Sequence, residues 1–281
     1  MPRQVSIAGE RAASVEDALA VLQGRKIAVL TGAGVSTDSG IPDYRGEGAT
    51  PRTPMTFQQF ASSAEFRKRY WAGSHLGWRR FRSATPNGGH LALAALERAG
   101  VSGGVITQNV DGLHSKAGSF RVVDLHGASD RVRCISCGQV FARDDFVARM
   151  TASNPWLEEP DEVELRPDGD VEVSRIADFI TPACTVCGGI LRPDVVFFGE
   201  FIPTDKFAAA AGVLLAADAL LVAGSSLVVN SGIRLLDRAV KRALPIVIVN
   251  RGATRGDERA TVKLDAGTTQ TLGELAERLG A

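Results

Sequence analysis

The sequence predicts an α/β fold: a Rossmann-like, doubly wound parallel sheet with two smaller modules inserted into it. Short apolar runs alternate with helical patterns along most of the chain, which is the order of elements in such sheets. The first apolar run leads directly into Gly32-Ala33-Gly34, a pattern with which nucleotide-binding sheets bring their backbone close to a ligand. Two Cys-x-x-Cys pairs and an aromatic stretch interrupt the alternation and mark the insertions.

Five apolar runs read as buried parallel strands, because Val, Ile, Leu and Ala dominate them. They occupy residues 27–30, 104–107, 121–125, 219–223 and 246–250. Helical patterns occupy residues 14–23, 90–99, 206–217, 231–243 and 269–279. This alternation predicts strands whose carboxyl ends meet at one edge of the sheet.

The loop after the first strand, residues 32–45, departs from the dinucleotide-binding pattern of dehydrogenases. It reads G-A-G-V-S-T-D-S-G-I-P-D-Y-R. The third glycine of G-x-G-x-x-G would fall at Thr37, and Pro42 disfavours helical dihedrals in the residue before it. We therefore expect a dinucleotide site bordered by an irregular polar loop. An ordinary glycine-rich turn is the alternative.

The four cysteines form two matched pairs, Cys134-x-x-Cys137 and Cys184-x-x-Cys187. Each tight turn presents two thiolates to one ion, so the pairs predict a single tetrahedral zinc site. Four thiolate ligands close the coordination shell, which makes the expected zinc structural and not catalytic. Disulfides or a redox Cys-x-x-Cys are the alternatives, and the lack of a secretory signal disfavours them.

We expect residues 1–281 to form one domain with two insertions. The Rossmann-like large part spans about residues 14–45, 86–127 and 194–281. A stretch at about 46–85 is rich in aromatic and arginine side chains and is expected to form a helical lobe. The smaller zinc-binding module spans about 128–193 and includes an acidic insert at 158–170.

Composition and charge narrow the functional class. Lys plus Arg and Asp plus Glu number 32 each, so the formal net charge is zero. We expect no nucleic-acid partner, because binding to phosphates draws on a basic surplus. The N-terminal residues show no apolar signal region and the sequence contains no long apolar run. We expect a soluble, cytoplasmic protein without membrane contact, of unassigned oligomeric state.

Polar residues follow the expected strands at the edge where the carboxyl ends meet. Gln108, Asn109 and Asp111 follow the second strand, and His126 follows the third. The last two strands lead into Gly-Ser-Ser at 224–226 and Asn-Arg-Gly at 250–252. A single residue of this kind is more often a cap or a turn residue. Four such ends, beside the loop at 32–45, predict one site in the crevice.

These motifs together resemble the sirtuins, the NAD-consuming protein deacylases. They are G-A-G-V-S-T-D-S-G-I-P-D-Y-R, T-Q-N-V-D-G-L-H, L-H-G, the paired Cys-x-x-Cys, V-V-F-F-G-E, A-G-S-S-L and I-V-N, and they run in this order from about residue 26 to 268. The resemblance implies a single catalytic domain that uses NAD as co-substrate, holds one structural zinc ion and acts on acylated protein lysines.

The resemblance also implies which residues contact NAD. The N–H groups of Ala33 and Gly34 and the hydroxyl of Ser225 are expected at the phosphates. Asn109 and Asp111 are expected at the nicotinamide carboxamide, which both donates and accepts hydrogen bonds. The other expected contacts are Gln108 and Asn250 at the riboses, Asp43, Tyr44 and Arg45 in a mobile loop over the cofactor, and Gly32, Ser36, Val110, Gly224, Ser226, Arg251, Gly252 and Thr268.

His126 is implied to be the general base, because histidine accepts a proton near neutral pH. In the family, the acyl oxygen of the substrate lysine attacks a ribose carbon as nicotinamide leaves, and the base then deprotonates a ribose hydroxyl. Asn109 and Asp111 are the other implied catalytic residues. We interpret His90 as structural, and His114 as structural or as a residue just behind those that contact NAD.

The substrate peptide is implied to pair with a strand at residues 195–200. These residues are Val195, Val196, Phe197, Phe198, Gly199 and Glu200, and a plain edge strand is the alternative. Gly73 stands three positions after Tyr70, so the Tyr-x-x-Arg pair of sirtuins that prefer acidic acyl groups is missing. Residues 69–78, the cysteine spacing and residues 167–171 look most like the class II branch, which has bacterial and animal mitochondrial members. That branch is associated with weak deacetylation, removal of bulkier acyl groups and ADP-ribosyl transfer.

The sequence therefore predicts an NAD-dependent protein-lysine deacylase that transfers the acyl group to ADP-ribose and releases nicotinamide. A protein mono-ADP-ribosyltransferase with the same NAD cleavage is one alternative, and a non-catalytic NAD-sensing zinc scaffold is another. The presence of His126 disfavours the scaffold, because a sensor needs no base. Thr37 in place of the third glycine disfavours a dehydrogenase.

Overall fold

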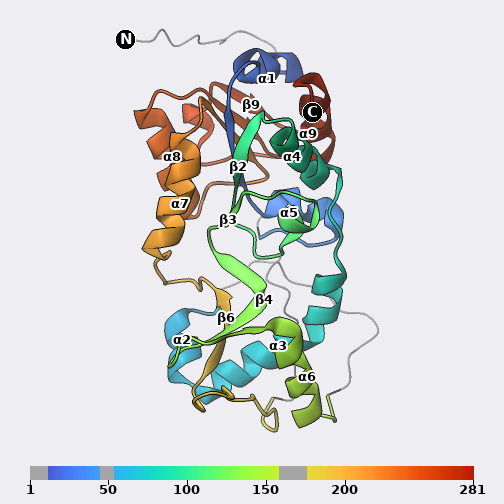
Figure 1. The fold of residues 1–281 in the computed structure, drawn as a ribbon, viewed down its shortest axis with the longest axis vertical. Coiled ribbons are helices and arrows are strands. Elements are labelled where there is room, and N and C mark those ends of the chain that lie inside the picture. Colours follow the sequence, from blue (N-terminus) through green and yellow to red (C-terminus); the bar gives the residue numbers. More distant parts are fainter. Residues whose placement is uncertain (1–11, 45–53, 158–175) are drawn as a thin grey trace.

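The computed structural model describes residues 12–44, 54–157 and 176–281. Figure 1 shows an elongated molecule with two parts along its long axis. The upper part is built around a six-stranded sheet and the lower part contains a three-stranded sheet. The acidic insert predicted at 158–170 lies outside the described residues, as does the class-specific stretch at 167–171.

The large sheet is parallel throughout, with the strand order β3-β2-β1-β7-β8-β9. Its strands are β1 (Ile27–Thr31), β2 (Ser102–Thr107), β3 (Val122–Asp124), β7 (Ala219–Ala223), β8 (Ile246–Val249) and β9 (Val262–Leu264). The chain moves outward from β1 to β3 and then returns to β7 beside β1. Doubly wound sheets bind nucleotides at this reversal.

The five expected strands are confirmed, whereas the sequence analysis does not predict β9. Three residues, Val-Lys-Leu, are too short to show a periodicity. Strand β9 pairs with β8 alone and forms one edge of the sheet. Its existence therefore depends on the backbone hydrogen bonds that β8 offers.

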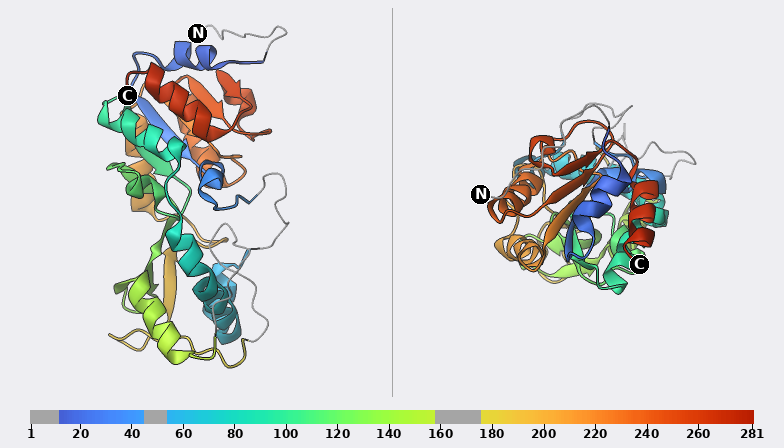
Figure 2. Two further views of the ribbon diagram at one scale, coloured as in Figure 1. Left: turned by 90° about the vertical axis from the view of Figure 1, so that its right-hand side faces the viewer. Right: turned by 90° about the horizontal axis from the view of Figure 1, so that it is seen from above.

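Helices cover both faces of the large sheet (Figure 2). On one face lie α1 (Val15–Leu22), α4 (Gly88–Arg98) and α9 (Thr268–Arg278), and on the other α7 (Thr204–Leu215) and α8 (Asn230–Lys241). Successive side chains of a strand point to opposite faces. Ile27 and Val29 of β1 accordingly pack in the first core, and Ala28 and Leu30 in the second. All five helices expected from the sequence are present.

The lower part combines both insertions around one core. Its elements are α2 (Phe57–Ser62), α3 (Ala64–Ser83), β4 (Gly127–Cys134), β5 (Val140–Ala142), α6 (Arg143–Ser153) and β6 (Leu191–Val195). Phe60 and Trp71 of the helical lobe pack in the same buried cluster as Phe146 and Leu191 of the cysteine module. The two predicted insertions therefore pack as one unit, because neither buries its apolar face alone.

A buried cation joins α6 to α3 inside this unit. The Arg143 guanidinium lies 4.6 Å from the Trp71 ring and 5.0 Å from the Trp78 ring, and it donates to the carbonyl and hydroxyl of Ser74. Burial lowers the pKa of Arg143 to about 10, so the side chain stays charged at neutral pH. Cation–π contact and charge-assisted hydrogen bonds take the place of a carboxylate partner here.

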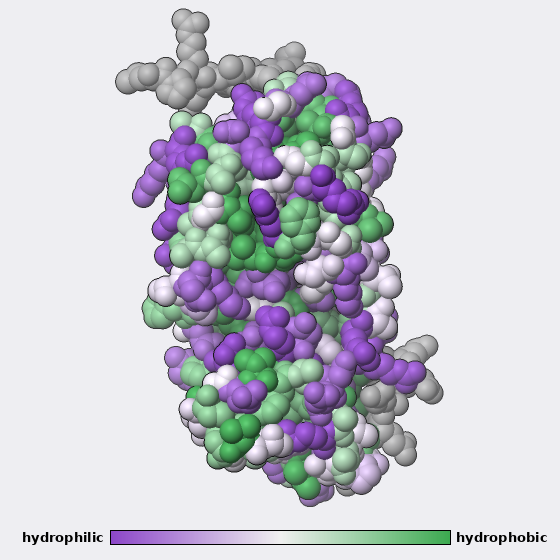
Figure 3. All heavy atoms as spheres, viewed as in Figure 1, coloured by the Kyte–Doolittle hydropathy of each residue, from purple (hydrophilic) through white to green (hydrophobic). Residues whose placement is uncertain are grey.

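The exposed surface is mixed in character. On the face seen in Figure 3, hydrophilic and hydrophobic residues are interspersed over both parts of the molecule. Exposed large apolar side chains are spread along the chain, among them Leu91, Phe120 and Leu215. Within the described ranges, no helix has the length and apolar character needed to span a bilayer.

Candidate active site and metal centre

The loop after β1 is irregular, as the sequence predicts. It forms two short 3₁₀ turns, Ala33–Val35 and Thr37–Ser39, where a dehydrogenase would start an α-helix. Gly40 ends the second turn with a φ of 81°, in the left-handed region that glycine adopts without strain. The backbone therefore leaves the sheet edge without the helix N-terminus that usually receives a pyrophosphate.

The glycines of this loop serve close packing against the loop after β7. The Gly34 N–H donates to the Gly224 carbonyl at 2.9 Å. A Cβ on Gly32 would lie 2.8 Å from the Gly224 oxygen, and one on Gly34 would lie 2.9 Å from the Gly224 Cα. The Gly34 N–H is thus used within the protein in this structure, and its expected contact with a phosphate stays a prediction.

Asn109 and Asp111 meet the loop after β1 at Ser36. The Ser36 hydroxyl donates to Asp111 Oδ2 at 2.7 Å and accepts from Asn109 Nδ2 at 3.1 Å. Asn109 Nδ2 also lies 3.2 Å from the Gly32 carbonyl, and the other Asp111 oxygen accepts from the Leu113 N–H. These bonds fix an amide and a carboxylate side by side at the crevice, so the structure brings the predicted pair together.

Two buried histidines lie beneath this pair. The rings of His90 and His114 are 4.9 Å apart, and His114 Nε2 lies 2.8 Å from the Thr31 hydroxyl. His90 Nδ1 accepts from the Asn87 N–H, which leaves Nε2–H to face Ser36 at 3.4 Å. Burial, with a smaller contribution from His90, lowers the pKa of His114 to about 3. These contacts support the interpretation of both histidines as structural.

The neutral state of His114 predicts a pH dependence of stability. An unfolded chain protonates this histidine below about pH 6.5, whereas the folded one does so only near pH 3. Between these values the unfolded state binds more protons than the folded state. The contribution of neutral His114 to the free energy of unfolding is therefore complete above pH 6.5 and decreases as the pH falls, by up to about 1.4 kcal/mol per pH unit. Urea unfolding from pH 7 to 4 should show a shallower loss for His114→Gln than for the native sequence. Parallel curves would mean that His114 does not stay neutral in the fold.

His126 is held by two hydrogen bonds at the carboxyl end of β3. Its Nδ1 lies 2.8 Å from the Gln108 carbonyl, which can only accept, so Nδ1 carries the hydrogen. Its Nε2 lies 2.9 Å from the Ser231 hydroxyl at the start of α8. Burial lowers the pKa of His126, with a smaller contribution from the charge of Lys206. The ring is therefore neutral near pH 7, which is the state that a general base requires.

The other residues expected at the cofactor lie around the same crevice. Ser225 donates to Gln108 Oε1 at 2.6 Å, and Thr268 donates to the Gly34 carbonyl at 3.2 Å. Asn250 Nδ2 donates to the carbonyls of Arg251 and Gly252, which are exposed. The backbone carbonyls of Ala33, Val110 and Ser226 accept from the N–H groups of Ser36, Ser129 and Arg255. Asp43 is partly buried, and Arg45 lies outside the described residues.

The segment predicted to grip a peptide is a strand only at its first residue. Strand β6 ends at Val195, and Glu200 donates its N–H to the Phe197 carbonyl across a turn in which Gly199 has a φ of 83°. The expectation of a strand through residue 200 is therefore corrected, because the glycine turn ends the pairing. Val196 donates its N–H to the His126 carbonyl at 2.7 Å, which joins this segment to the backbone of His126.

Two further contacts shape this turn. Arg192 forms a two-fold hydrogen-bonded ion pair with Glu200, at 2.7 Å and 2.5 Å, and the Glu200 carboxylate also accepts from the Phe197 N–H. The exposed Phe198 ring packs edge-on against Tyr44, with the ring centres 6.4 Å apart. Arg192 of β6 therefore holds the turn at residues 197–200, and Phe198 of this turn contacts Tyr44 in the loop after β1.

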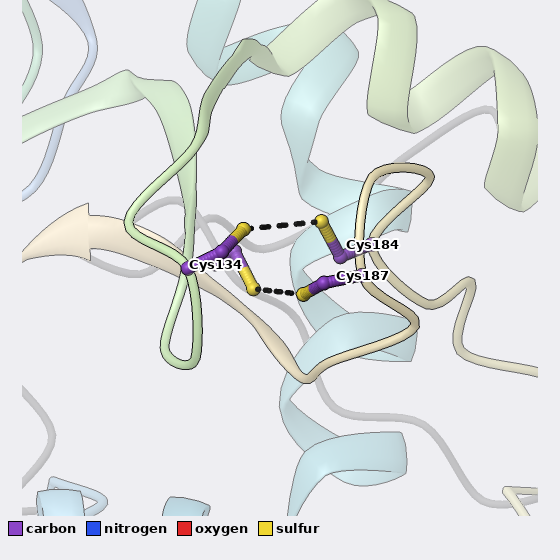
Figure 4. A group of neighbouring side chains, drawn as sticks. Cys134, Cys184 and Cys187 are labelled. Atoms are coloured by element: carbon purple, nitrogen blue, oxygen red, sulfur yellow. Dashed lines mark hydrogen bonds between the residues drawn. The ribbon is translucent and has the colours of Figure 1, made fainter.

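The four cysteines converge in the lower part, at the tips of two loops (Figure 4). Their sulfur atoms all lie within 4.8 Å of one another, with 3.5 Å between Cys134 and Cys187 and 3.8 Å between Cys137 and Cys184. Zn–S bonds of about 2.3 Å in a tetrahedron require sulfur separations of about 3.8 Å. The donor set and its spacing therefore fit one structural zinc ion.

Backbone N–H groups of the first knuckle favour the thiolate form of Cys134. The N–H of Cys137, with other groups of the turn, lowers the pKa of Cys134 to about 6. In each loop a glycine N–H donates to the carbonyl of the first cysteine. Gly138 donates to Cys134, and Gly188 donates to Cys184. Both glycines have a positive φ, at 75° and 72°, which the turn requires.

The fold and the site define a nucleotide-binding α/β protein with a histidine at its crevice and a four-cysteine metal centre in a second unit. The chain belongs to the Sir2 family, whose model, described as "Sir2 family", matches residues 32–231. The resemblance to the sirtuins is thereby confirmed.

Relatives and solved structures agree with this assignment. The chain is 53% identical over 265 residues to NAD-dependent protein deacetylase 1 of Mycobacterium avium, covering 93% of this chain and 94% of that protein. It is 44% identical over 247 residues to NAD-dependent protein deacylase Sirt4 of Drosophila melanogaster, covering 85% and 79%. A solved complex of Sir2 with a p53 peptide and NAD+ matches with a TM-score of 0.77 at 32% identity, covering 95% of this chain and 99% of that one.

Proposed function

We propose that this protein is an NAD-dependent protein-lysine deacylase, which releases nicotinamide and transfers the acyl group from lysine to ADP-ribose. The observation that carries the proposal is the position of His126. Its ring lies at the carboxyl edge of the large sheet, and its carbonyl accepts from Val196 in the segment expected to bind the peptide. The names of the relatives and the Sir2 complex with NAD+ and a peptide support the same activity.

The residues at the reversal between β1 and β7 fit NAD. Polar side chains follow four strands at this edge of the sheet, and glycines let the loops after β1 and β7 pack closely together. The Asn250 amide nitrogen is bound to carbonyls, which leaves its oxygen to accept from a ribose hydroxyl. Bound NAD supplies a ribose carbon that becomes open to attack as nicotinamide leaves.

Asn109 and Asp111 would hold the nicotinamide carboxamide. The Asn109 amide nitrogen already donates to Ser36 and to the Gly32 carbonyl, so its oxygen is the group that can accept from the carboxamide. The Asp111 carboxylate is held by Ser36 and by the Leu113 N–H. Pre-oriented polar groups of this kind bind a ligand without reorganising as it reacts.

His126 would take a proton from a ribose hydroxyl. Its Nδ1 is committed to the Gln108 carbonyl, so Nε2 is the accepting atom. The lowered pKa keeps that nitrogen unprotonated at neutral pH. Positioned proton transfer contributes typically about 10²–10⁴-fold to a rate.

A panel of acyl-lysine peptides tests the proposal. Acetyl, succinyl, long-chain and lipoyl peptides are incubated with the protein, with and without NAD, and the products are measured by mass spectrometry. We expect NAD-dependent loss of the acyl group together with nicotinamide and an acyl-ADP-ribose. Succinyl should be the poorest substrate, because Gly73 offers no cation for its carboxylate and an unpaired buried charge is costly.

A second experiment, with NAD labelled in its adenosine part, can contradict the proposed deacylase activity. Stable label on an acceptor protein with no peptide deacylated would replace the proposal with mono-ADP-ribosyl transfer. NAD left intact in every reaction would support the non-catalytic scaffold instead. A protein in which Asn109 is changed to Ala is the matched control, since it should cleave NAD poorly with every peptide.

A further inference from the structure

A continuous chain of hydrogen bonds leads from the loop after β7 to His126. The Leu227 N–H donates to Ser225 Oγ at 3.3 Å, and the Ser225 hydroxyl donates to Gln108 Oε1 at 2.6 Å. Gln108 Nε2 faces Ser231 Oγ at 3.4 Å, and Ser231 Oγ lies 2.9 Å from His126 Nε2. The chain closes on itself, because His126 Nδ1 donates to the backbone carbonyl of Gln108.

Groups that can only donate or only accept a hydrogen bond determine the direction of these bonds. A carbonyl only accepts, so His126 Nδ1 carries the hydrogen and the neutral ring presents a lone pair at Nε2. An amide nitrogen only donates, so Gln108 Nε2 occupies a lone pair of Ser231. The hydroxyl hydrogen of Ser231 is therefore left to point at His126 Nε2.

Two features indicate that the fold is built for this arrangement. Ser231 is 5% exposed and lies in the first turn of α8, so its hydroxyl has little access to water. A Cβ at the next residue, Gly232, would lie only 3.0 Å from Gln108 Nε2. The glycine leaves the room that the Gln108 amide needs beside Ser231. Neither residue was singled out by the sequence analysis.

We propose that Ser231 is a positioning residue for His126, whose hydroxyl, oriented by Gln108, keeps Nε2 of the ring as a proton acceptor. The proposal rests on the role of His126 in the proposed function. A proton on Nε2 would force the Ser231 hydroxyl to turn away and lose its acceptor inside the protein, and buried groups that lose a hydrogen bond are costly. The hydrogen-bond chain thus favours the neutral ring over the charged one.

Other groups act on the same ring and must be separated from Ser231. Burial lowers the pKa of His126, and the positive charge of Lys206 on α7 lowers it further, while the Gln108 carbonyl raises it. None of these contributions changes when the Ser231 hydroxyl is removed. A comparison of Ser231 variants therefore isolates the hydroxyl.

NMR of the ligand-free protein labelled with ¹⁵N-histidine tests the proposal. The chain has four histidines, and His126→Ala identifies the resonance. We expect the Nδ1–H tautomer in the native protein, and in Ser231→Ala a pKa of His126 raised by roughly half to one pH unit, as the loss of one hydrogen bond to the neutral form predicts. Ser231→Thr keeps the hydroxyl and should titrate as the native protein does. An Nε2–H tautomer in the native protein, or superimposable titrations of native and Ser231→Ala protein, would overturn the proposal.

The pH profile of deacylation gives a second readout. Because a raised pKa leaves less neutral base at a given acidic pH, the acidic limb of the profile should move to higher pH in Ser231→Ala and return in Ser231→Thr. An equal change in both variants would show that packing and not the hydroxyl matters, and would overturn the proposal. If the native protein deacylates nothing, the proposed function fails, while the tautomer and the titration still decide the role of Ser231.

Discussion

Changing His126 to Ala is expected to slow acyl transfer by about 10²–10⁴-fold, the usual loss when a positioned base is removed. In the proposed function this ring accepts the proton, and its Nε2 is the ring nitrogen that carries no hydrogen. Nicotinamide exchange into NAD should fall much less, because the base acts after nicotinamide has left. Single-turnover deacylation and exchange of labelled nicotinamide measure the two steps separately.

The control for this substitution is His126→Gln, which keeps a polar side chain but cannot act as a base near neutral pH. Both variants should be equally slow in acyl transfer and should melt near the native temperature. The acidic loss of activity in the native protein should lie below the usual titration range of histidine, since burial lowers the pKa of His126. Undiminished acyl transfer in both variants would remove His126 from the role of base.

Replacing Cys134 with Ala is expected to release the zinc ion and to loosen the lower part of the molecule. A structural zinc ion contributes its binding free energy directly to folding, on the order of 10 kcal/mol in small zinc domains. Cys134 packs in the cluster that also holds Trp71 and Phe146, so the loss should reach the whole lower part. The cores of the large sheet are separate clusters and should persist.

Metal analysis and thermal melting check this expectation. The native protein should hold one zinc ion per chain and Cys134→Ala much less, with an early melting step followed by that of the large sheet. Ser136→Ala changes a residue of the same turn that is not a ligand, and it should keep both the metal and the melting profile. A full complement of zinc in Cys134→Ala would refute the four-cysteine site.

The elements predicted best are those whose signal lies within a few residues. The central strands β1 and β7 are buried at every position and apolar at all but Thr31, so a short run was enough to find them. The cysteine pairs were equally clear, since the Cys-x-x-Cys spacing fixes two ligands by itself. Strands β4, β5 and β9 escaped prediction, and of these β5 and β9 have only three residues each and depend on a neighbour for their hydrogen bonds.

The candidate site was predicted as a set of residues but not as a network. Asn109, Asp111 and His126 were placed by their positions at strand ends, and the structure joins Asn109 and Asp111 through Ser36 and holds His126 on the Gln108 carbonyl. Ser231 was missed because it is separated from His126 by 105 positions and looks like an ordinary residue at a helix start. The bond from the Gly34 N–H to the Gly224 carbonyl was also missed, because it joins two loops that are distant in the sequence.

The sequence by itself determined the family and the α/β fold class, and it predicts the four cysteines as metal ligands and His126 as the base. These follow from local patterns, in which each residue type carries its chemistry with it. Only the tertiary structure decided which donor faces which acceptor. It shows that Gly32 and Gly34 allow the loops after β1 and β7 to pack closely, and that the segment after Val195 forms a turn. It also shows that the Ser231 hydroxyl lies beside Nε2 of His126. The reason is physical, since a hydrogen bond depends on ångström distances between groups that folding brings together from far apart in the chain.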